Sequence, residues 1–162
     1  MLLVSDANIF IDFEVAGLAA ELFQLRHDIV VPDALFEQEL SVRHTRLIEL
    51  GLRRQTLTGE QVAEAYQMQT KYRGTGVFDL LALVLAKSLN CALVTGDRKL
   101  REAATAEGLQ LMGTLTLIEH LYVQGILDLR AVESAYQRMQ IAGRRIPAKE
   151  VAAQLARLRR LP

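Results

Sequence analysis

Short segments of strand length alternate with longer segments of helical periodicity over the first 113 residues. The segments of strand length are LLVS (2–5), DIVVP (28–32), the candidate strand RRQTLT (53–58), CALVTGD (91–97) and LQLMG (109–113). Apolar residues recur at helical spacing in the segments between them, which are 8–25, 34–50, 59–72, 77–90 and 98–108. This alternation predicts an α/β fold with a parallel sheet flanked by helices on both faces.

From Thr114 onward the pattern is helical throughout. Three helices are expected, in segments 115–125, 128–143 and 147–161, with Gly125 and Gly143 at helix ends and Pro147 at a first helical position. We therefore expect one α/β domain over residues 1–113. A helical extension over residues 114–162 is expected to pack on that domain or on a partner.

Composition is that of an ordinary globular domain, with 162 residues, 51% hydrophobic and 23% charged. The single cysteine, Cys91, precludes an intrachain disulfide and is interpreted as a buried thiol in an apolar run. No basic leader precedes the first apolar run, and no stretch approaches the roughly 20 apolar residues of a membrane helix. These features predict a cytoplasmic protein that does not enter a membrane.

Charge is balanced overall but unevenly distributed along the chain. A formal net charge of +0 does not favour nucleic-acid binding, because phosphate recognition usually requires positive charge. However, Arg26 is the only Lys or Arg among residues 1–40, and Glu150 is the only acid among residues 138–162. The asymmetry indicates either an acidic centre with a basic arm or two solvated surfaces of opposite sign.

Two acids follow predicted strands directly. Asp6 comes after residues 2–5, and Asp97 ends the segment CALVTGD. Because ligands of open parallel sheets bind beyond the carboxyl ends of the strands, both side chains are expected to face one crevice. Carboxylates placed together repel unless a cation joins them.

A third acid, Asp79, lies near the start of an otherwise apolar helix. It shares a helix face with Leu83 and Ala86, where an unpaired carboxylate is costly to bury. It is either a metal ligand or a first-turn acid favoured by the helix dipole.

The segment VPDALFEQEL supplies a fourth carboxylate, from either Glu37 or Glu39. We prefer Glu37, because in a regular α-helix it shares a face with Ala34, Ser41 and His44 near the end of the preceding strand.

Several oxygen ligands with open water positions are what Mg²⁺ or Mn²⁺ requires. No competing chemistry is evident, because the histidines are scattered, no Cys–His spacing matches a zinc site, and no Gly-rich phosphate loop of the GxxxxGK kind is present. Neither Ser5 nor Ser41 has the context of a catalytic triad.

Four motifs occur in an order that resembles one family. They are VSDANIFID, VPDALFEQEL, GVFDLLALVLAK and LVTGDRKLREAA. Together they resemble the PIN domain family over residues 2–113, especially its bacterial toxin–antitoxin branch. The segments GTLTLIEHLYVQGIL and MQIAGRRIP are similar to the C-terminal helices of one uncharacterised PIN subgroup.

The resemblance implies cleavage of single-stranded RNA with Mg²⁺ or Mn²⁺, leaving a 5′-phosphate and a 3′-hydroxyl. It assigns the metal-binding and catalytic roles to the acids Asp6, Glu37, Asp79 and Asp97. It assigns Asn8 and Thr95 to supporting positions that orient carboxylates or waters. It also implies an antitoxin protein whose segment occupies the acidic groove, and a homodimer.

One departure from the family pattern concerns the number of metal ions. Many members carry a further acid shortly after the position of Asp97, where this chain has Lys99 and Leu100. We therefore expect one tightly bound ion, with a second recruited by substrate. The neighbouring bases Arg98, Lys99 and Arg101 either contact phosphates or are solvated.

Two other functions remain open at the level of sequence. A haloacid-dehalogenase-like phosphatase would need an Asp where Asn8 stands and a further acid where Arg101 stands. A catalytically inactive PIN-like binding module is the second alternative, because fold does not determine function.

Overall fold

Five parallel strands form one sheet in the order β3-β2-β1-β4-β5, in a computed structural model that describes residues 1–162. The strands are β1 (Leu2–Ser5), β2 (Asp28–Pro32), β3 (Arg53–Gln55), β4 (Ala92–Val94) and β5 (Leu111–Met112). The predicted α/β fold with a parallel sheet is confirmed. The first two strands have the predicted limits, and the other three are shorter than predicted.

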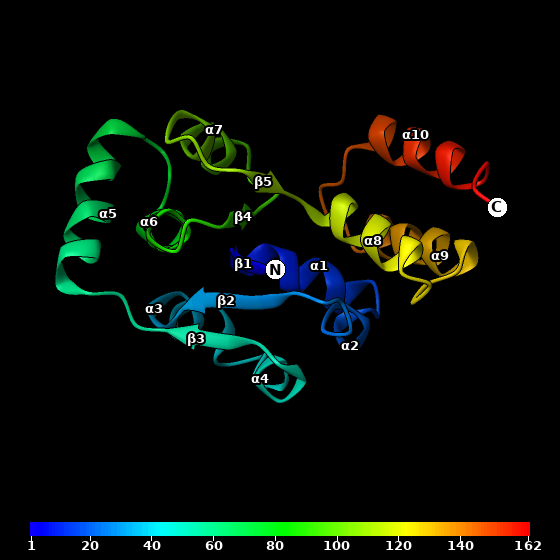
Figure 1. The fold of residues 1–162 in the computed structure, drawn as a ribbon, viewed down its shortest axis with the longest axis horizontal. Coiled ribbons are helices and arrows are strands. Elements are labelled where there is room, and N and C mark those ends of the chain that lie inside the picture. Colours follow the sequence, from blue (N-terminus) through cyan, green and yellow to red (C-terminus); the bar gives the residue numbers. More distant parts are fainter.

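Helices cover the sheet and extend beyond it. They are α1 (Ala7–Val15), α2 (Ala19–Leu22), α3 (Asp33–Leu35), the π-helix η1 (Phe36–Leu40), α4 (Arg46–Leu50), α5 (Gly59–Lys71), α6 (Val77–Ser88), α7 (Arg98–Ala106), α8 (Thr114–Val123), α9 (Leu129–Ile141) and α10 (Ala148–Leu158). In Figure 1, α5 and α6 lie on one side of the sheet, whereas α1, α8 and α9 lie on the other.

Two helices predicted as continuous are divided in the structure. The segment 8–25 breaks at Gly17, whose φ of +73° favours glycine and whose surroundings are occupied by the guanidinium of Arg138. The segment 34–50 contains the π-helix, in which the Ser41 amide donates to the Phe36 carbonyl at 2.8 Å. A π-helix has a wider turn than an α-helix, so it changes which side chains share a face.

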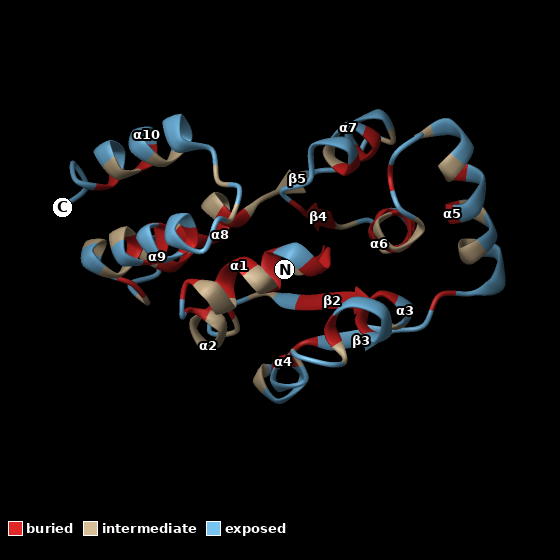
Figure 2. Ribbon diagram, turned by 180° about the vertical axis from the view of Figure 1, so that it is seen from behind, coloured by how far each residue is buried: buried red, intermediate tan, exposed pale blue.

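One apolar core of 43 buried residues runs through the whole chain. Leu117, Leu121, Val132, Met139 and Leu158 from the C-terminal helices belong to it. Figure 2 shows the buried positions concentrated in β1, β2 and β4, in α6 and on the inner sides of α1, α8 and α9. Residues 114–162 therefore pack against α1 and α2 rather than standing apart from the sheet.

The last helix is attached by polar contacts as well as apolar ones. The Gln154 amide donates to the Leu115 carbonyl at 2.8 Å, and the Gln154 oxygen pairs with the Tyr136 hydroxyl. Pro147 precedes the first residue of α10 instead of occupying it. None of the helices is both long enough and apolar enough to span a bilayer.

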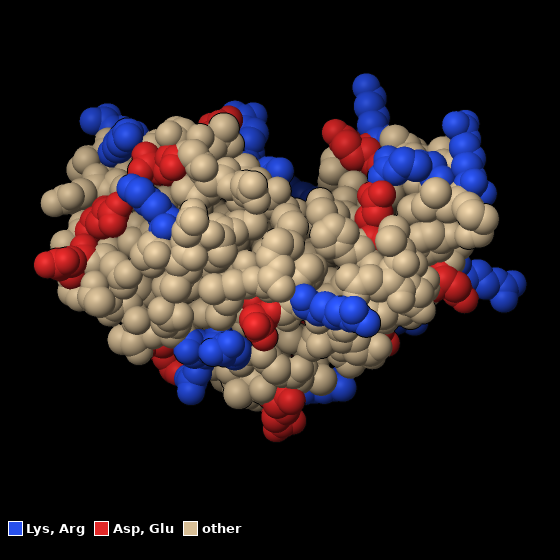
Figure 3. Space-filling model, in the orientation of Figure 1, with Lys and Arg blue, Asp and Glu red and all other residues tan.

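Surface charge is mixed on the face drawn in Figure 3. Lys and Arg side chains are interspersed there with Asp and Glu, and the surface is hollowed at the edge between α7 and α10. A surface without one dominant sign agrees with the formal net charge of +0.

Candidate acidic site at the carboxyl ends of the strands

Asp6 is the most deeply buried acid of the chain and begins α1 as its N-cap residue. Its carboxylate accepts from the Ile9 amide at 3.2 Å and from the Thr95 hydroxyl. Burial raises the pKa of Asp6 to about 7; the two hydrogen bonds oppose this rise, and the charges of Asp79 and Asp12 add to it. A carboxyl group with this pKa changes its protonation state near neutral pH.

Thr95 joins the end of β4 to the end of β1. Its buried hydroxyl donates to Asp6 and accepts from the Asp97 amide at 3.0 Å. Asp97 is exposed and caps α7, because its carboxylate accepts from the Leu100 amide at 2.8 Å. The two predicted strand-end acids are thus connected through a single threonine.

Asp79 lies in the first turn of α6 and is half-buried. Burial, followed by the charges of Glu39 and Asp97, raises the pKa of Asp79 to about 6. None of the influences on this pKa comes from a cation, so the carboxylate is uncompensated. Asp6, Asp79 and Asp97 therefore form one electrostatically connected group.

The preference for Glu37 over Glu39 is not supported by the geometry. Glu37 is exposed, and its carboxylate accepts from Arg54 at 2.9 Å, in a shallow pocket shared with Asp33. Glu39 is exposed as well, but its charge acts on Asp79, and the partial covering of its carboxylate raises the pKa of Glu39 itself. Both residues lie in the π-helix, whose wider turn invalidates the face assignment made for a regular α-helix.

Asn8 lies on the exposed side of the first turn of α1, two residues after Asp6. Its carbonyl oxygen and its side-chain oxygen each accept from Arg144 at 3.4 Å. Arg144 also donates through Nε to Asp12 at 2.6 Å, and the same carboxylate accepts from the Thr114 hydroxyl at 2.9 Å.

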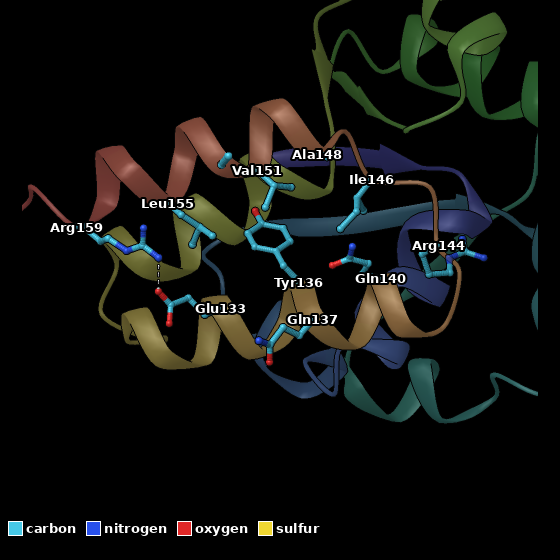
Figure 4. Close-up of a pocket in the computed structure, with 11 residues that line it drawn as sticks. Glu133, Tyr136, Gln137, Gln140, Arg144, Ile146, Ala148, Val151, Leu155 and Arg159 are labelled. Carbon is cyan, nitrogen blue, oxygen red and sulfur yellow. Dashed lines mark hydrogen bonds and ion pairs between the residues drawn. The ribbon is translucent and has the colours of Figure 1, made fainter.

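Asp12 and Arg144 were not among the predicted site residues. A sequence signal existed for Asp12, which stands among apolar residues six positions after Asp6 in VSDANIFID. No comparable signal exists for Arg144, because Arg144 and its partner Asp12 are far apart in the chain. Figure 4 places Arg144 at one end of a groove of about 470 Å³ between α9 and α10, with Arg159 at the other end.

The basic side chains near Asp97 differ in the contacts that they make with the rest of the protein. Arg101 donates to the carbonyl of Thr95 at 2.7 Å and to that of Met112 at 3.3 Å, so it secures the ends of β4 and β5. Arg98 forms an exposed pair with Glu102 at 3.4 Å. Lys99 lies against Gly74 in the loop before α6 and forms no ion pair. Lys99 is therefore the freest of the three to meet a phosphate.

The donor set of this site consists of carboxylate oxygens only. No three Asp, Glu, His or Cys side chains lie close enough together to enclose a metal ion. Mg²⁺ commonly binds through one or two carboxylates and keeps several waters, so such an open arrangement fits Mg²⁺ better than a metal that needs a complete protein cage. Asp6 and Asp79 would provide these oxygens, since neither has a cationic partner among the influences on its pKa.

Comparison with known families agrees with the fold. A family model described as a PIN domain matches residues 2–160, which is nearly the whole chain. The match includes the C-terminal helices as well as the sheet. No curated protein matches the sequence significantly.

Proposed function

Because this chain belongs to the PIN domain family, whose members are in general nucleases that use divalent metals, we propose that it is a metal-dependent endoribonuclease acting on single-stranded RNA. The observation that carries the proposal is the buried Asp6 carboxylate beside the uncompensated Asp79. Asp6 stabilises the start of α1 as its N-cap, but burial makes its ionised form costly, and Asp79 has no cationic partner. The cost of these two carboxylates is understandable if they serve a ligand.

In this proposal Asp6 and Asp79 would hold Mg²⁺ or Mn²⁺ directly, and Asp97 would act on the ion through a bound water. The cation would neutralise the acids and stabilise negative charge on the phosphate under attack. Thr95 holds Asp6 in place and favours its ionised form, because a hydrogen bond to a carboxylate lowers its pKa. Lys99 and Leu100 stand where many relatives have a further acid, which favours one tightly bound ion.

Glu39 is the proposed general base. Its raised pKa makes it a stronger base than an ordinary glutamate, and its exposure leaves it accessible to water. It would accept the proton of a water that attacks phosphorus as the bond to the 3′-oxygen breaks. Protonation of that oxygen by solvent would give a 3′-hydroxyl and a 5′-phosphate.

The biological setting is proposed from resemblance. Similarity of the motifs to the bacterial toxin branch supports a cytoplasmic toxin with an antitoxin partner, and it supports a homodimer. A short neighbouring gene encoding a small helical or DNA-binding protein would support the toxin role.

Cleavage of a single-stranded RNA tests the proposed reaction. We expect cleavage with Mn²⁺, none with EDTA, and at least a hundredfold loss in Asp79→Asn, because an uncharged amide is a poorer ligand. Asp28→Asn, at the opposite end of the sheet, is the matched control and should retain activity.

Three results would contradict the proposed function. Undiminished cleavage by Asp79→Asn would remove that acid from the site. Hydrolysis of p-nitrophenyl phosphate without RNA cleavage would favour the phosphatase alternative. Absence of both cleavage and Mn²⁺ binding would favour an inactive binding module.

A further inference from the structure

The loop between α9 and α10 reaches the first turn of α1, which carries Asp6. Gly143, with a φ of +75°, ends the turn after α9, and Arg144 follows it directly. Arg144 then contacts Asp12 and Asn8, which lie on the same helix as Asp6. A residue of the C-terminal extension is therefore bound directly beside the acidic site.

The contact is partly buried and uses the branched shape of the guanidinium. The side chains of Arg144 and Asp12 are 26% and 12% exposed, so solvent weakens this pair less than a surface ion pair. Its Nε donates to the Asp12 carboxylate, while Nη2 donates to the backbone carbonyl oxygen and to the side-chain oxygen of Asn8. A lysine could neutralise Asp12 but could not bind both residues in this way.

Two consequences for the acidic site follow from these contacts. Arg144 supplies a positive charge to Asp12, whose own charge acts on Asp6. Arg144 also occupies the side-chain oxygen of Asn8, which leaves the two amide N–H donors of Asn8 without a partner in the protein. Those donors lie two residues from Asp6, where they are available to a carboxylate, a water or a phosphate oxygen.

We infer that Arg144 is a positioning residue of the acidic site, and that it acts by holding Asn8 and the first turn of α1. This inference rests on the proposed function. It makes the C-terminal extension a working part of the site rather than a separate packing element.

Substitutions at Arg144 separate positioning from stability. Arg144→Gln loses the ion pair with Asp12, so it should lower the melting temperature and also reduce cleavage. Arg144→Lys should recover most of the melting temperature through Asp12. It should still show a roughly tenfold lower kcat and a roughly tenfold weaker Mn²⁺ affinity, the usual cost of removing a group that orients a metal ligand. Mn²⁺ affinity is read from the rise in melting temperature on titration.

Asn8→Ala tests the proposed route. It should reproduce the tenfold losses of Arg144→Lys, and the double variant should lose less than twofold more, because both changes interrupt one contact. Arg159→Gln is the matched control, since it breaks another arginine ion pair of the extension, with Glu133 at 2.8 Å. Its kcat and Mn²⁺ affinity should equal those of the wild type.

The possible outcomes are distinguishable. Wild-type kcat and Mn²⁺ affinity in Arg144→Lys, or equal losses in Arg159→Gln, would overturn the inference. If the wild type binds Mn²⁺ but cleaves no RNA, the proposed function fails, and the Mn²⁺ affinities of the variants alone decide the inference. If the wild type neither binds Mn²⁺ nor cleaves RNA, both fail.

Discussion

The hydroxyl of Thr95 donates to the carboxylate of Asp6, so the end of β4 supplies the polar partner of an acid at the end of β1. The same oxygen accepts from the Asp97 amide at 3.0 Å. The buried Thr95 side chain therefore supplies a hydrogen bond to the Asp6 carboxylate after β1. It also fixes the Asp97 amide at the start of α7, after β4. We expect the alignment of the two strand ends to depend on this threonine.

Thr95→Val tests that dependence, because valine keeps the shape and removes the hydroxyl. We expect the free energy of unfolding in EDTA to fall by about 1–3 kcal/mol, the cost of leaving buried polar groups unpaired. Thr95→Ser keeps the hydroxyl and should lose less. Denaturant melts at one pH measure both variants, and equal losses would show that the methyl group, not the hydrogen bond, matters.

Stability in EDTA should depend on pH in the direction set by Asp6 and Asp79. Their folded pKa values, about 7 and about 6, lie above the ordinary value of 3.8, so the folded protein binds more protons between these limits. Their contribution to stability is complete below pH 4 and is lost as pH rises towards 7. For Asp6 the loss is at most about 4 kcal/mol.

Asp79→Asn should remove the part of this pH-dependent loss of stability that comes from Asp79. At pH 8 in EDTA the variant should melt above the wild type, and near pH 4 the two should converge. Adding Mn²⁺ at pH 8 should raise the wild-type melting temperature more, because the wild type binds the ion more tightly. Thermal melts at several pH values measure this, with Asp28→Asn as the control. A variant that melts below the wild type at pH 8 in EDTA would contradict the expectation.

Glu39→Gln and Glu37→Gln form a matched pair on one helix. We expect Glu39→Gln to lower kcat by about 10²–10⁴-fold, the range for loss of a general base. Glu37→Gln should leave kcat within about twofold of the wild type, because the Glu37–Arg54 pair is exposed and such pairs contribute little. Single-turnover cleavage measures the step directly. The reverse ranking would restore the original assignment of Glu37.

His27 should make the protein sensitive to mild acid. Burial, followed by the N-terminal charge and His120, lowers the pKa of His27, and its Nδ1 is buried without a partner. Below about pH 6.5 the unfolded chain takes up a proton that the folded protein resists, so this histidine reduces stability as pH falls. The melting temperature of His27→Gln should therefore rise relative to that of the wild type as pH falls from 7 to 5. A difference independent of pH would exclude this cause.

The sheet was predictable from local patterns, and the same patterns singled out Asp6, Asp79 and Asp97 as candidate acids. Apolar runs of strand length located β1 and β4, and parallel strands place residues such as Asp6 and Asp97 at one edge. Asp79 was recognisable because a carboxylate interrupts an apolar helical face. Each of these inferences needed only a few neighbouring residues and the rule that parallel strands end together.

Glu39 and Arg144 were not predictable in the same way. The helix face on which Glu39 lies depends on a π-helix, and apolar periodicity at the α-helical repeat does not reveal a π-helix. Arg144 acts on Asp12 through the packing of the C-terminal helices on α1, which no local window contains. The first limit is a matter of helix geometry, and the second is a matter of tertiary contact.

The pair of Asp12 and Arg144 joins positions separated by 132 residues. A chain is synthesised from its N-terminus, so the strand that ends just before Asp6 is made long before Arg144, which binds the following helix through Asp12. Closing so distant a contact is slow compared with forming the local helices. A nascent chain therefore carries Asp6 for most of its synthesis without the contact from Arg144, and the complete site forms only after Arg144 has been made.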